Sequence, residues 1–250
     1  MSDGEVTLAL IAVTLVSMLI GSLVIRQRRA PLSLRPIMGY EVLPLAVDES
    51  VESDRPIHFS MGSSALAGES AGAALASADA IYHLVMRLSF ERRLPLVTTS
   101  DAVTLALATD TLRKAYIARD NLESFRPEAA AWYPAGKHSL VFAAGVAARA
   151  ADIRASSQVL LGNFGEELAL VAEAGRAVNQ RLVANSTTVE GQAVAQVVSD
   201  ATIVGEELFV AGAYLDQKNT AAMSSLVALD TLRWLVIIGI LVAIVVNAVD

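Results

Sequence analysis

The residues of this chain that are best placed to do chemistry form a short glycine-rich turn, Gly162–Gly165, with Glu166 and Glu167 directly after it. An apolar run, Gln158 to Leu161, precedes the turn and a helical pattern follows it, so a strand is predicted to lead through the turn into a helix. Glycines at such a place let backbone amides approach an anion at the helix N-terminus. The two glutamates would instead satisfy the helix dipole and repel a phosphate. The sequence therefore leaves two interpretations of this turn: a structural turn with acidic helix capping, or one wall of a ligand pocket.

Two further polar turns, Gly62-Ser63 and Ser100-Asp101, are predicted to lie at the same edge of a sheet, because each follows a predicted strand. Ligands of open α/β sheets bind at the carboxyl ends of strands, so a small-molecule site at this edge is one functional hypothesis. No cofactor is predicted, because the chain has neither a G-x-G-x-x-G fingerprint nor the lysine of a P-loop. The residues predicted to line the site are Gly62, Ser63, Ser100, Asp101, Gly162, Asn163, Phe164, Gly165 and Glu166.

A hydrolase-like pattern lacks the context that its chemistry needs. Gly68–Gly72 matches G-x-S-x-G, but Ser70 falls in or near a helix start and not on a turn directly after a strand, where a hydrolase elbow holds its serine. His58, His83 and His138 form no local metal motif, and the absence of cysteine excludes a thiol nucleophile. No catalytic residue is assigned, and the sequence favours a protein that is not an enzyme.

A second Gly-Glu-Glu-Leu stretch, Gly205–Leu208, repeats residues 165–168 forty positions later. Four carboxylates would form a metal site if the two turns met in space. Dinuclear carboxylate sites usually add a Glu-x-x-His pattern, and neither turn has a histidine nearby. No metal site is therefore predicted.

An alternation of strands and helices has to position these turns. Short apolar strands between helical segments are typical of a parallel sheet that is covered on both faces. The fold class predicted is α/β, with a Rossmann-like open, mainly parallel sheet and flanking helices over residues 57–216. The predicted strands are Ile57–Met61, Leu94–Thr99, Ser139–Ala144, Gln158–Leu161 and Arg181–Asn185. The predicted helices are Ala65–Arg92, a helix from Ser100 or Asp101 through Tyr116, Gly145–Arg154, Glu166–Val178, Val189–Ser199 and Thr202–Leu215.

Two proline-containing segments interrupt this alternation. The connector 27–56 holds four prolines and an acidic run, which argue against a long helix, and Tyr40–Val47 is a candidate edge strand. Residues 125–136 are predicted to be a loop that carries Trp132 and Tyr133. These aromatic side chains either dock on the domain or dip into a membrane interface, and docking is favoured.

A membrane anchor is predicted at each end of the chain. Val6 to Ile25 carries no charge over twenty residues, which is roughly 30 Å of helix, about the thickness of the hydrocarbon core. Acidic residues precede this run and Arg26 follows it, the reverse of a signal peptide. Trp234 to Val249 is a shorter second span, with a buried core helix as its alternative.

The predicted topology is two-pass, in a bacterial inner membrane. The charges place both termini outside and the central domain in the cytoplasm. The segments are 1–26 (transmembrane), 27–56 (connector), 57–216 (α/β domain), 217–232 (connector or helix) and 233–250 (transmembrane). No ionisable residue is expected inside either span, which argues against transport.

Small residues spaced four apart in both spans predict close helix pairing within or between subunits. They are Ser17, Gly21, Gly239, Ala243 and Asn247.

Two stretches, Gly162–Glu167 and Gly205–Leu215, resemble signature stretches of an uncharacterised two-span membrane-protein family of Chloroflexota-type bacteria, known only as a domain of unknown function. The resemblance covers most of Leu32 to Leu232. It implies a membrane location and assigns no activity.

Composition limits the partners. The net charge is −7, and 54% of the residues are hydrophobic. A nucleic-acid partner is not expected, because the basic cluster Arg26–Arg35 lies where anionic lipid headgroups would be. We expect a lipid bilayer, a second copy of the chain and another membrane protein as partners. The expected function is a non-catalytic oligomeric scaffold or partner-binding platform, and the alternative is a small-molecule sensor or enzyme.

Overall fold

The computed structural model describes residues 3–27, 34–88, 94–216 and 218–249. The chain divides into two compact units. One comprises Arg35–Ala211, and the other comprises Met1–Leu34 together with Gly212–Asp250. The larger unit holds the sheet and the smaller one holds the two terminal helices.

The larger unit is built on a six-stranded sheet in the order β3-β2-β1-β4-β5-β6, in which every neighbouring pair is parallel. This is the strand order of the doubly wound Rossmann layout, with the order reversing between β1 and β4. The prediction of an α/β fold with a parallel sheet is confirmed. The strands are β1 (His58–Gly62), β2 (Leu96–Thr99), β3 (Ala130–Trp132), β4 (Ser157–Asn163), β5 (Arg181–Ser186) and β6 (Ala201–Thr202).

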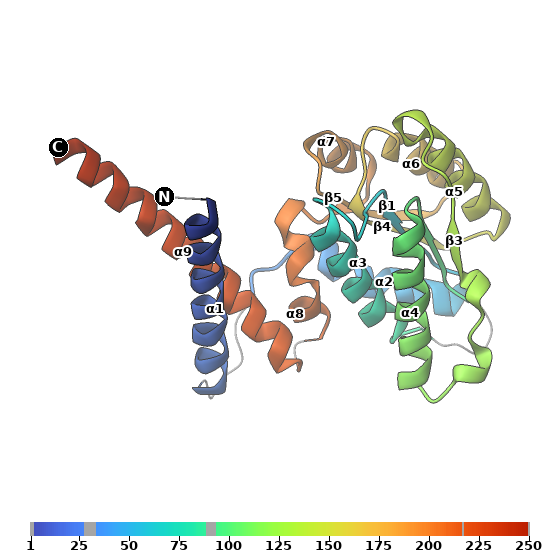
Figure 1. Ribbon diagram of the computed structural model, residues 1–250. Coiled ribbons are helices and arrows are strands. Elements are labelled where there is room, and N and C mark those ends of the chain that lie inside the picture. The colour runs from blue at the N-terminus through green and yellow to red at the C-terminus, as the bar shows by residue number, and fades with distance from the viewer. Residues whose placement is uncertain (1–2, 28–33, 89–93, 217, 250) are drawn as a thin grey trace. The chain divides into compact units, whose positions relative to one another are not determined.

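Helices cover both faces of this sheet (Figure 1). The helices α2 (Met38–Ser53), α3 (Ala71–Val85) and α4 (Ala102–Ala118) lie on one face. The helices α5 (Leu140–Asp152), α6 (Leu168–Arg176) and α7 (Val189–Val198) lie on the other. Short 3-10 segments and one short helix complete the described connections. They are η1 (Leu122–Ser124), η2 (Pro127–Ala129), η3 (Lys137–Ser139), η4 (Gly205–Val210) and α8 (Ala211–Leu215).

The helix α2 lies where the sequence predicted a non-helical connector and an edge strand, so both predictions are wrong. Pro44 lies inside the helix and removes one backbone donor. Tyr40, Leu43 and Val47 recur at helical spacing and are buried, and this face packs over β4, β5 and β6. Burial of that apolar face compensates for the lost hydrogen bond.

Two more differences concern the segment between β2 and β4. The strand predicted at Ser139–Ala144 is wrong, because Leu140 begins the helix α5 and buries Phe142, Val146 and Ala150 at helical spacing. A short apolar run does not distinguish a strand from a buried helix. The loop predicted at 125–136 contains the edge strand β3, whose three residues are too few to give a pattern.

Some predicted helix bounds also differ. The helix predicted at Ala65–Arg92 begins only at Ala71, and residues 89–93 lie outside the described part. The helix predicted at Thr202–Leu215 is replaced by the end of β6, the 3-10 segment η4 and α8. Gly205 has a φ of +47° and starts η4, which a continuous α-helix would not allow.

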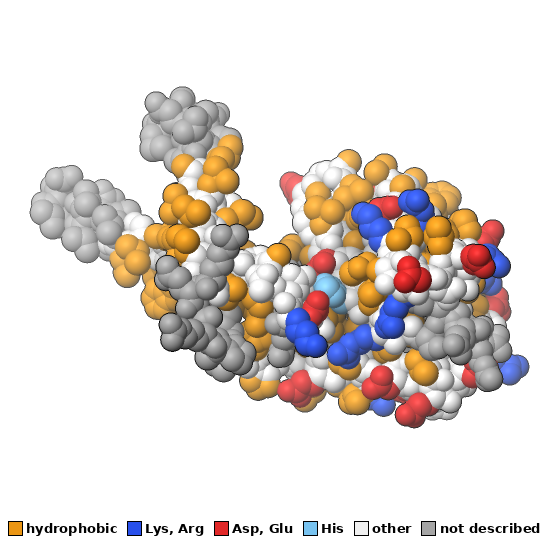
Figure 2. All heavy atoms as spheres, turned by 90° about the horizontal axis from the view of Figure 1, so that it is seen from below, with side chains coloured by type: hydrophobic (Ala, Val, Ile, Leu, Met, Phe, Trp, Pro, Cys, Tyr) orange, Lys and Arg blue, Asp and Glu red, His pale blue; other side chains and the backbone are white. Residues whose placement is uncertain are grey.

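The smaller unit contains the helices α1 (Asp3–Gln27) and α9 (Thr220–Val249), which pack against each other. Among the described residues, one helix is long and apolar enough to cross a membrane, the stretch Thr220–Leu241 of α9. The apolar stretch described in α1, Ile11–Ile25, is shorter. Figure 2 shows mainly hydrophobic side chains on these two helices, at its left, and acidic and basic side chains scattered over the α/β unit.

The α1–α9 contact is close because small residues meet there. Ser17 is 2% exposed. A Cβ atom on Gly21 would collide with the backbone of Ser224 and Ala228. Among the described residues, no atom outside the α9 backbone lies within 4 Å of the Cβ position of Gly239. The side chains of Ala243 and Asn247 lie outside the described residues.

Candidate functional site at the carboxyl edge of the sheet

The turn that follows β4 is closed by the protein's own atoms. Gly162 has a φ of +143°, and a Cβ atom there would collide with the Ser64 hydroxyl and the Met61 carbonyl. A Cβ atom on Gly62, whose φ is +59°, would collide with the carbonyl of Asn163. Both glycines are needed because the ends of β1 and β4 approach each other closely.

Hydrogen bonds link the loops after β1, β2 and β4. The amide and the hydroxyl of Ser63 both donate to the carbonyl of Asn163, at 2.8 and 2.9 Å. The amide of Asn163 donates to the Ser64 hydroxyl at 2.8 Å. The Ser100 amide donates to the Gly62 carbonyl at 2.9 Å. These predicted site residues therefore lie together, and they bind one another.

The next two residues of the turn are also engaged. Phe164 is fully buried, and its carbonyl accepts hydrogen bonds from the hydroxyls of Ser186 (2.7 Å) and Thr188 (2.5 Å). The amide of Gly165 donates to the Glu167 carboxylate at 2.9 Å. Glu166 is exposed, with its carboxylate 3.5 Å from the His138 ring. These contacts favour the structural interpretation of the turn over an anion cradle.

Asp101 and Trp132 also have structural contacts. The Asp101 carboxylate accepts hydrogen bonds from the amide and the hydroxyl of Thr104, at 2.7 and 2.8 Å, and so caps α4. The Trp132 indole donates to the Ser100 carbonyl at 3.0 Å. This bond docks the β3 segment on the domain, as the favoured alternative predicted.

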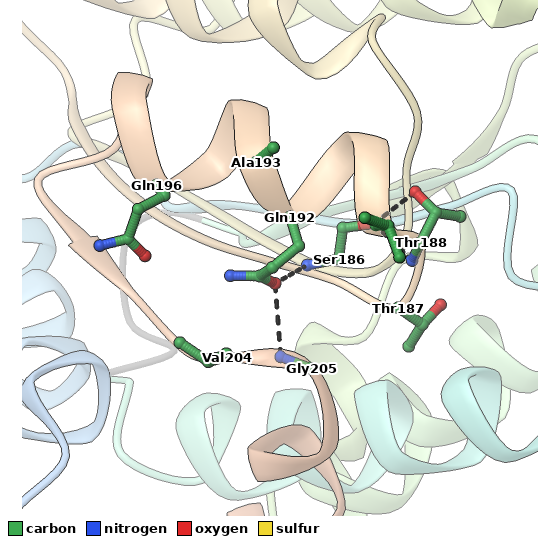
Figure 3. A pocket seen from close by; sticks show the side chains of 9 residues that line it. Ser186, Thr187, Thr188, Gln192, Ala193, Gln196, Val204 and Gly205 are labelled. Carbon is green, nitrogen blue, oxygen red and sulfur yellow. Dashed lines mark hydrogen bonds between the residues drawn. The ribbon is translucent and has the colours of Figure 1, made fainter.

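A pocket of about 380 Å³ lies one strand further along the same edge, at the carboxyl end of β5 (Figure 3). The loop after β5, the first turns of α7 and the segment after β6 form its walls. The lining residues are Ser186, Thr187, Thr188, Val189, Gln192, Ala193, Gln196, Val204 and Gly205.

The walls of the pocket are fixed by side-chain hydrogen bonds. The Gln192 side-chain carbonyl accepts from the amides of Ser186 (3.0 Å) and Gly205 (3.4 Å), and so joins opposite sides of the pocket (Figure 3). The Gln196 side-chain carbonyl accepts from the Thr202 hydroxyl at 3.0 Å. The Thr188 hydroxyl accepts from the amide of Gly191 at 3.0 Å and caps α7. The pocket is therefore formed before any ligand enters it.

No lining residue is acidic, basic or a histidine. Hydroxyl and amide groups supply the polarity, and Val189, Ala193 and Val204 supply apolar wall. Glu190 lies in the first turn of α7 and opposes the attraction of the helix N-terminus for anions. The pocket suits an uncharged molecule.

This pocket is not among the sites predicted from the sequence. One signal was available, the polar run Asn185-Ser186-Thr187-Thr188 between a strand and a helix. The other walls of the pocket could not be predicted from the sequence. The strand β6 has only two residues, and the contacts of Gln192 join three separate segments.

In the two Gly-Glu-Glu-Leu stretches, Glu167 and Glu207 make structural contacts. Glu207 accepts from the Val204 amide at 2.8 Å and pairs with Arg35, while Glu167 binds Gly165 within its own turn. In the described part of the chain, no group of three histidine, cysteine or acidic residues is placed to hold a metal ion. The Ser70 hydroxyl accepts from the Ala65 amide at 2.9 Å, within a turn and not on a strand end.

His58 lies in the core at the opposite end of β1. Its Nε2 atom is 2.9 Å from the Thr98 hydroxyl. Burial lowers the pKa of His58 to about 4, and the neighbouring Gln158 side chain partly opposes that effect. The ring is neutral at pH 7 and has a structural role.

Comparison with known proteins gives a family and no activity. A family model described as Domain of unknown function (DUF6754) matches residues 2–250. No curated protein and no solved structure matches the chain. The resemblance to a domain family of unknown function is thereby confirmed.

Proposed function

Because the chain belongs to the family Domain of unknown function (DUF6754), its role has to come from its geometry, and we propose that it is a membrane-anchored, non-catalytic α/β domain that binds a small uncharged molecule. The observation that carries this proposal is the pocket at the carboxyl end of β5. Its volume of about 380 Å³ falls within the range of small-molecule sites, roughly 300–1,000 Å³.

The position of the pocket supports a binding role. Ligands of open parallel sheets bind outside the carboxyl ends of the strands. At this edge the β1, β2 and β4 loops are linked to one another, whereas the β5 loop leaves a hollow with polar and apolar walls. A bound molecule would lie mainly against apolar wall and would meet no charged lining residue.

The membrane anchor of this proposal consists of α1 and α9. The length and composition of α9 support one span. The uncharged run of α1 and the arginines after it support a second, with both termini outside and the α/β domain in the cytoplasm of a bacterial cell. The domain would then report a cytoplasmic molecule at the inner membrane.

A scaffold or partner-binding platform is the second candidate function. The exposed side of α7 favours it, because Val189 and Val197 are 83% and 79% exposed. A contiguous exposed apolar patch is typical of a surface that a partner covers, and these two valines would be part of such a patch.

The experiment is a thermal-shift screen of the full chain in detergent against neutral and charged metabolites. Ala193→Trp places an indole in the pocket, and Val197→Trp, one turn further along α7 and not among the lining residues, is the matched control. We expect a neutral compound to stabilise the wild type and the Val197→Trp variant, and not the Ala193→Trp variant. A stabilising compound that is unaffected by Ala193→Trp would refute the pocket.

A further inference from the structure

The side-chain amide of Gln192 in the pocket after β5 is held in one orientation. Its oxygen accepts hydrogen bonds from the backbone amides of Ser186 and Gly205, at 3.0 and 3.4 Å. Two N–H donors that face one position require an oxygen there, so the NH2 group has to occupy the other end of the side-chain amide. The backbone on opposite sides of the pocket therefore fixes where the Gln192 nitrogen points.

That nitrogen is a donor without an acceptor. Among the described residues, Nε2 of Gln192 is buried and has no hydrogen-bond partner. In Figure 3 it points away from Ser186, toward the side of the pocket where Gln196 lies. A buried donor that stays unpaired costs free energy, and an acceptor placed in the pocket would remove that cost. Nε2 of Gln192 is therefore a feature of the pocket that points to a ligand.

Most acceptor atoms of the lining side chains are already used. The hydroxyls of Ser186 and Thr188 accept from backbone amides, at 3.1 and 3.0 Å, and both donate to the carbonyl of Phe164. The side-chain oxygen of Gln196 accepts from the Thr202 hydroxyl. The pocket therefore offers a ligand a donor more readily than it offers an acceptor.

From this pattern we infer that the ligand is an uncharged carbonyl compound whose oxygen accepts a hydrogen bond from Nε2 of Gln192. The inference rests on the proposed function and names the class of ligand. A ketone, ester or lactone fits, whereas an alcohol also brings a hydroxyl donor that finds few free acceptors. In pockets of this kind a small number of polar groups fix orientation and specificity, so Gln192 is the specificity-determining residue.

The side chains beside the nitrogen leave room for a ligand to reach it. Gln196 and Val204 flank it in Figure 3, and both are exposed. Exposed side chains rotate without disturbing buried packing, so they can move aside for a carbonyl oxygen. The contacts of the Gln192 oxygen with the backbone stay in place during this movement, because they lie at the other end of the side-chain amide.

The first test is a fragment screen by ligand-observed NMR, with the full chain in lipid nanodiscs and empty nanodiscs as the reference. The library holds neutral compounds of matched size in three classes: carbonyl compounds without a donor, alcohols and hydrocarbons. A fragment is assigned to this pocket when Ala193→Trp abolishes its binding. We expect carbonyl compounds to outnumber each other class among these fragments by about threefold or more. Equal numbers in the three classes would overturn the inference.

A nearly isosteric substitution tests the donor itself. Gln192→Glu keeps an oxygen for the two backbone amides and removes the NH2 group. Val197→Glu adds the same charge to α7 at an exposed residue that does not line the pocket, and is the matched control. We expect Gln192→Glu to weaken binding of the carbonyl fragments about tenfold or more. Val197→Glu should change it less than about threefold, because exposed charges are screened.

An uncharged variant guards against an effect of the new carboxylate on folding. If thermal unfolding shows that Gln192→Glu destabilises the α/β unit, Gln192→Met replaces it and also lacks the donor. We expect the same preferential loss of carbonyl fragments. Equal losses for the Gln192 variant and for Val197→Glu would overturn the inference.

The outcomes also separate this inference from the proposed function on which it rests. Fragments whose binding is abolished by Ala193→Trp but unchanged by the Gln192 variants would overturn the ligand class and leave the binding function standing. A screen in which Ala193→Trp abolishes the binding of no fragment would overturn the proposed function, and this inference with it.

Discussion

The loops after β4 and β5 leave neighbouring parallel strands at the same edge of the sheet, yet they use their polar groups differently. After β4, the Asn163 amide and carbonyl bind the loop after β1, and the Gly165 amide binds a carboxylate of its own turn. After β5, hydrogen bonds to Gln192 and Thr188 hold the loop around a pocket. A glycine-rich turn can therefore serve close packing, while a hydroxyl-rich loop leaves room for a ligand.

Substitution of one glycine in each region should give the clearest difference in stability. Gly162 and Gly205 both have a positive φ, but only Gly162 is crowded. Gly162→Val is expected to destabilise the α/β unit by about 3 kcal/mol or more, because a side chain there is strained and collides with Met61 and Ser64. Gly205→Ala is expected to cost only about 1 kcal/mol, because nothing lies within 4 Å of its Cβ position. Denaturant unfolding measures both, and equal losses would break the comparison.

The second prediction concerns the stability of the fold at acidic pH. His58 has a pKa of about 4 in the folded protein and about 6.5 when unfolded, so between these values the unfolded chain binds more protons. The contribution of neutral His58 to the free energy of unfolding is fully present above pH 6.5. It is lost as the pH falls to about 4, a change of about 3 kcal/mol.

Unfolding curves at pH 7 and pH 5 test this contribution, with His58→Gln as the control that keeps the other titrating groups. We expect the variant to lose less stability between the two pH values than the wild type does. Because no residue lining the pocket titrates in this range, affinity for a neutral ligand should stay constant. Identical pH dependence of stability in the two proteins would show that His58 is not responsible.

The third prediction concerns the residue that joins the two loops. The Ser186 hydroxyl donates to the Phe164 carbonyl and accepts from the Thr188 amide. Ser186→Ala should destabilise the unit by about 1–2 kcal/mol, because buried polar partners lose a hydrogen bond. It should also weaken ligand binding, since the pocket loop is less well held. Unchanged thermal stability would contradict this role.

The smallest effect is expected at the exposed part of the pocket. The Thr187 hydroxyl is exposed and lies 3.4 Å from the Asn163 side chain. Thr187→Val should change the free energy of unfolding by less than about 0.5 kcal/mol. Any effect on ligand affinity would then report a direct contact with the ligand, and a large loss of stability would contradict the proposed surface position.

The strands β1, β2, β4 and β5 could be predicted from sequence because they are short, apolar and buried, as at Val159–Leu161. The strands β3 and β6 could not, because they have three and two residues. The helix α2 could not, because the penalty for Pro44 is local and the burial that offsets it depends on the tertiary fold. The pocket could not either. It depends on the close approach of Gly191 to the Phe164 carbonyl and on the reach of Gln192, and neither leaves a pattern in the chain.

Ligand binding in the pocket after β5 can be tested directly by native mass spectrometry of the full chain after incubation with a mixture of small metabolites. We predict a discrete neutral adduct on the wild type and on the Val197→Trp variant, and none on the Ala193→Trp variant. An adduct that Ala193→Trp retains, or no adduct on any of the three proteins, would contradict the account.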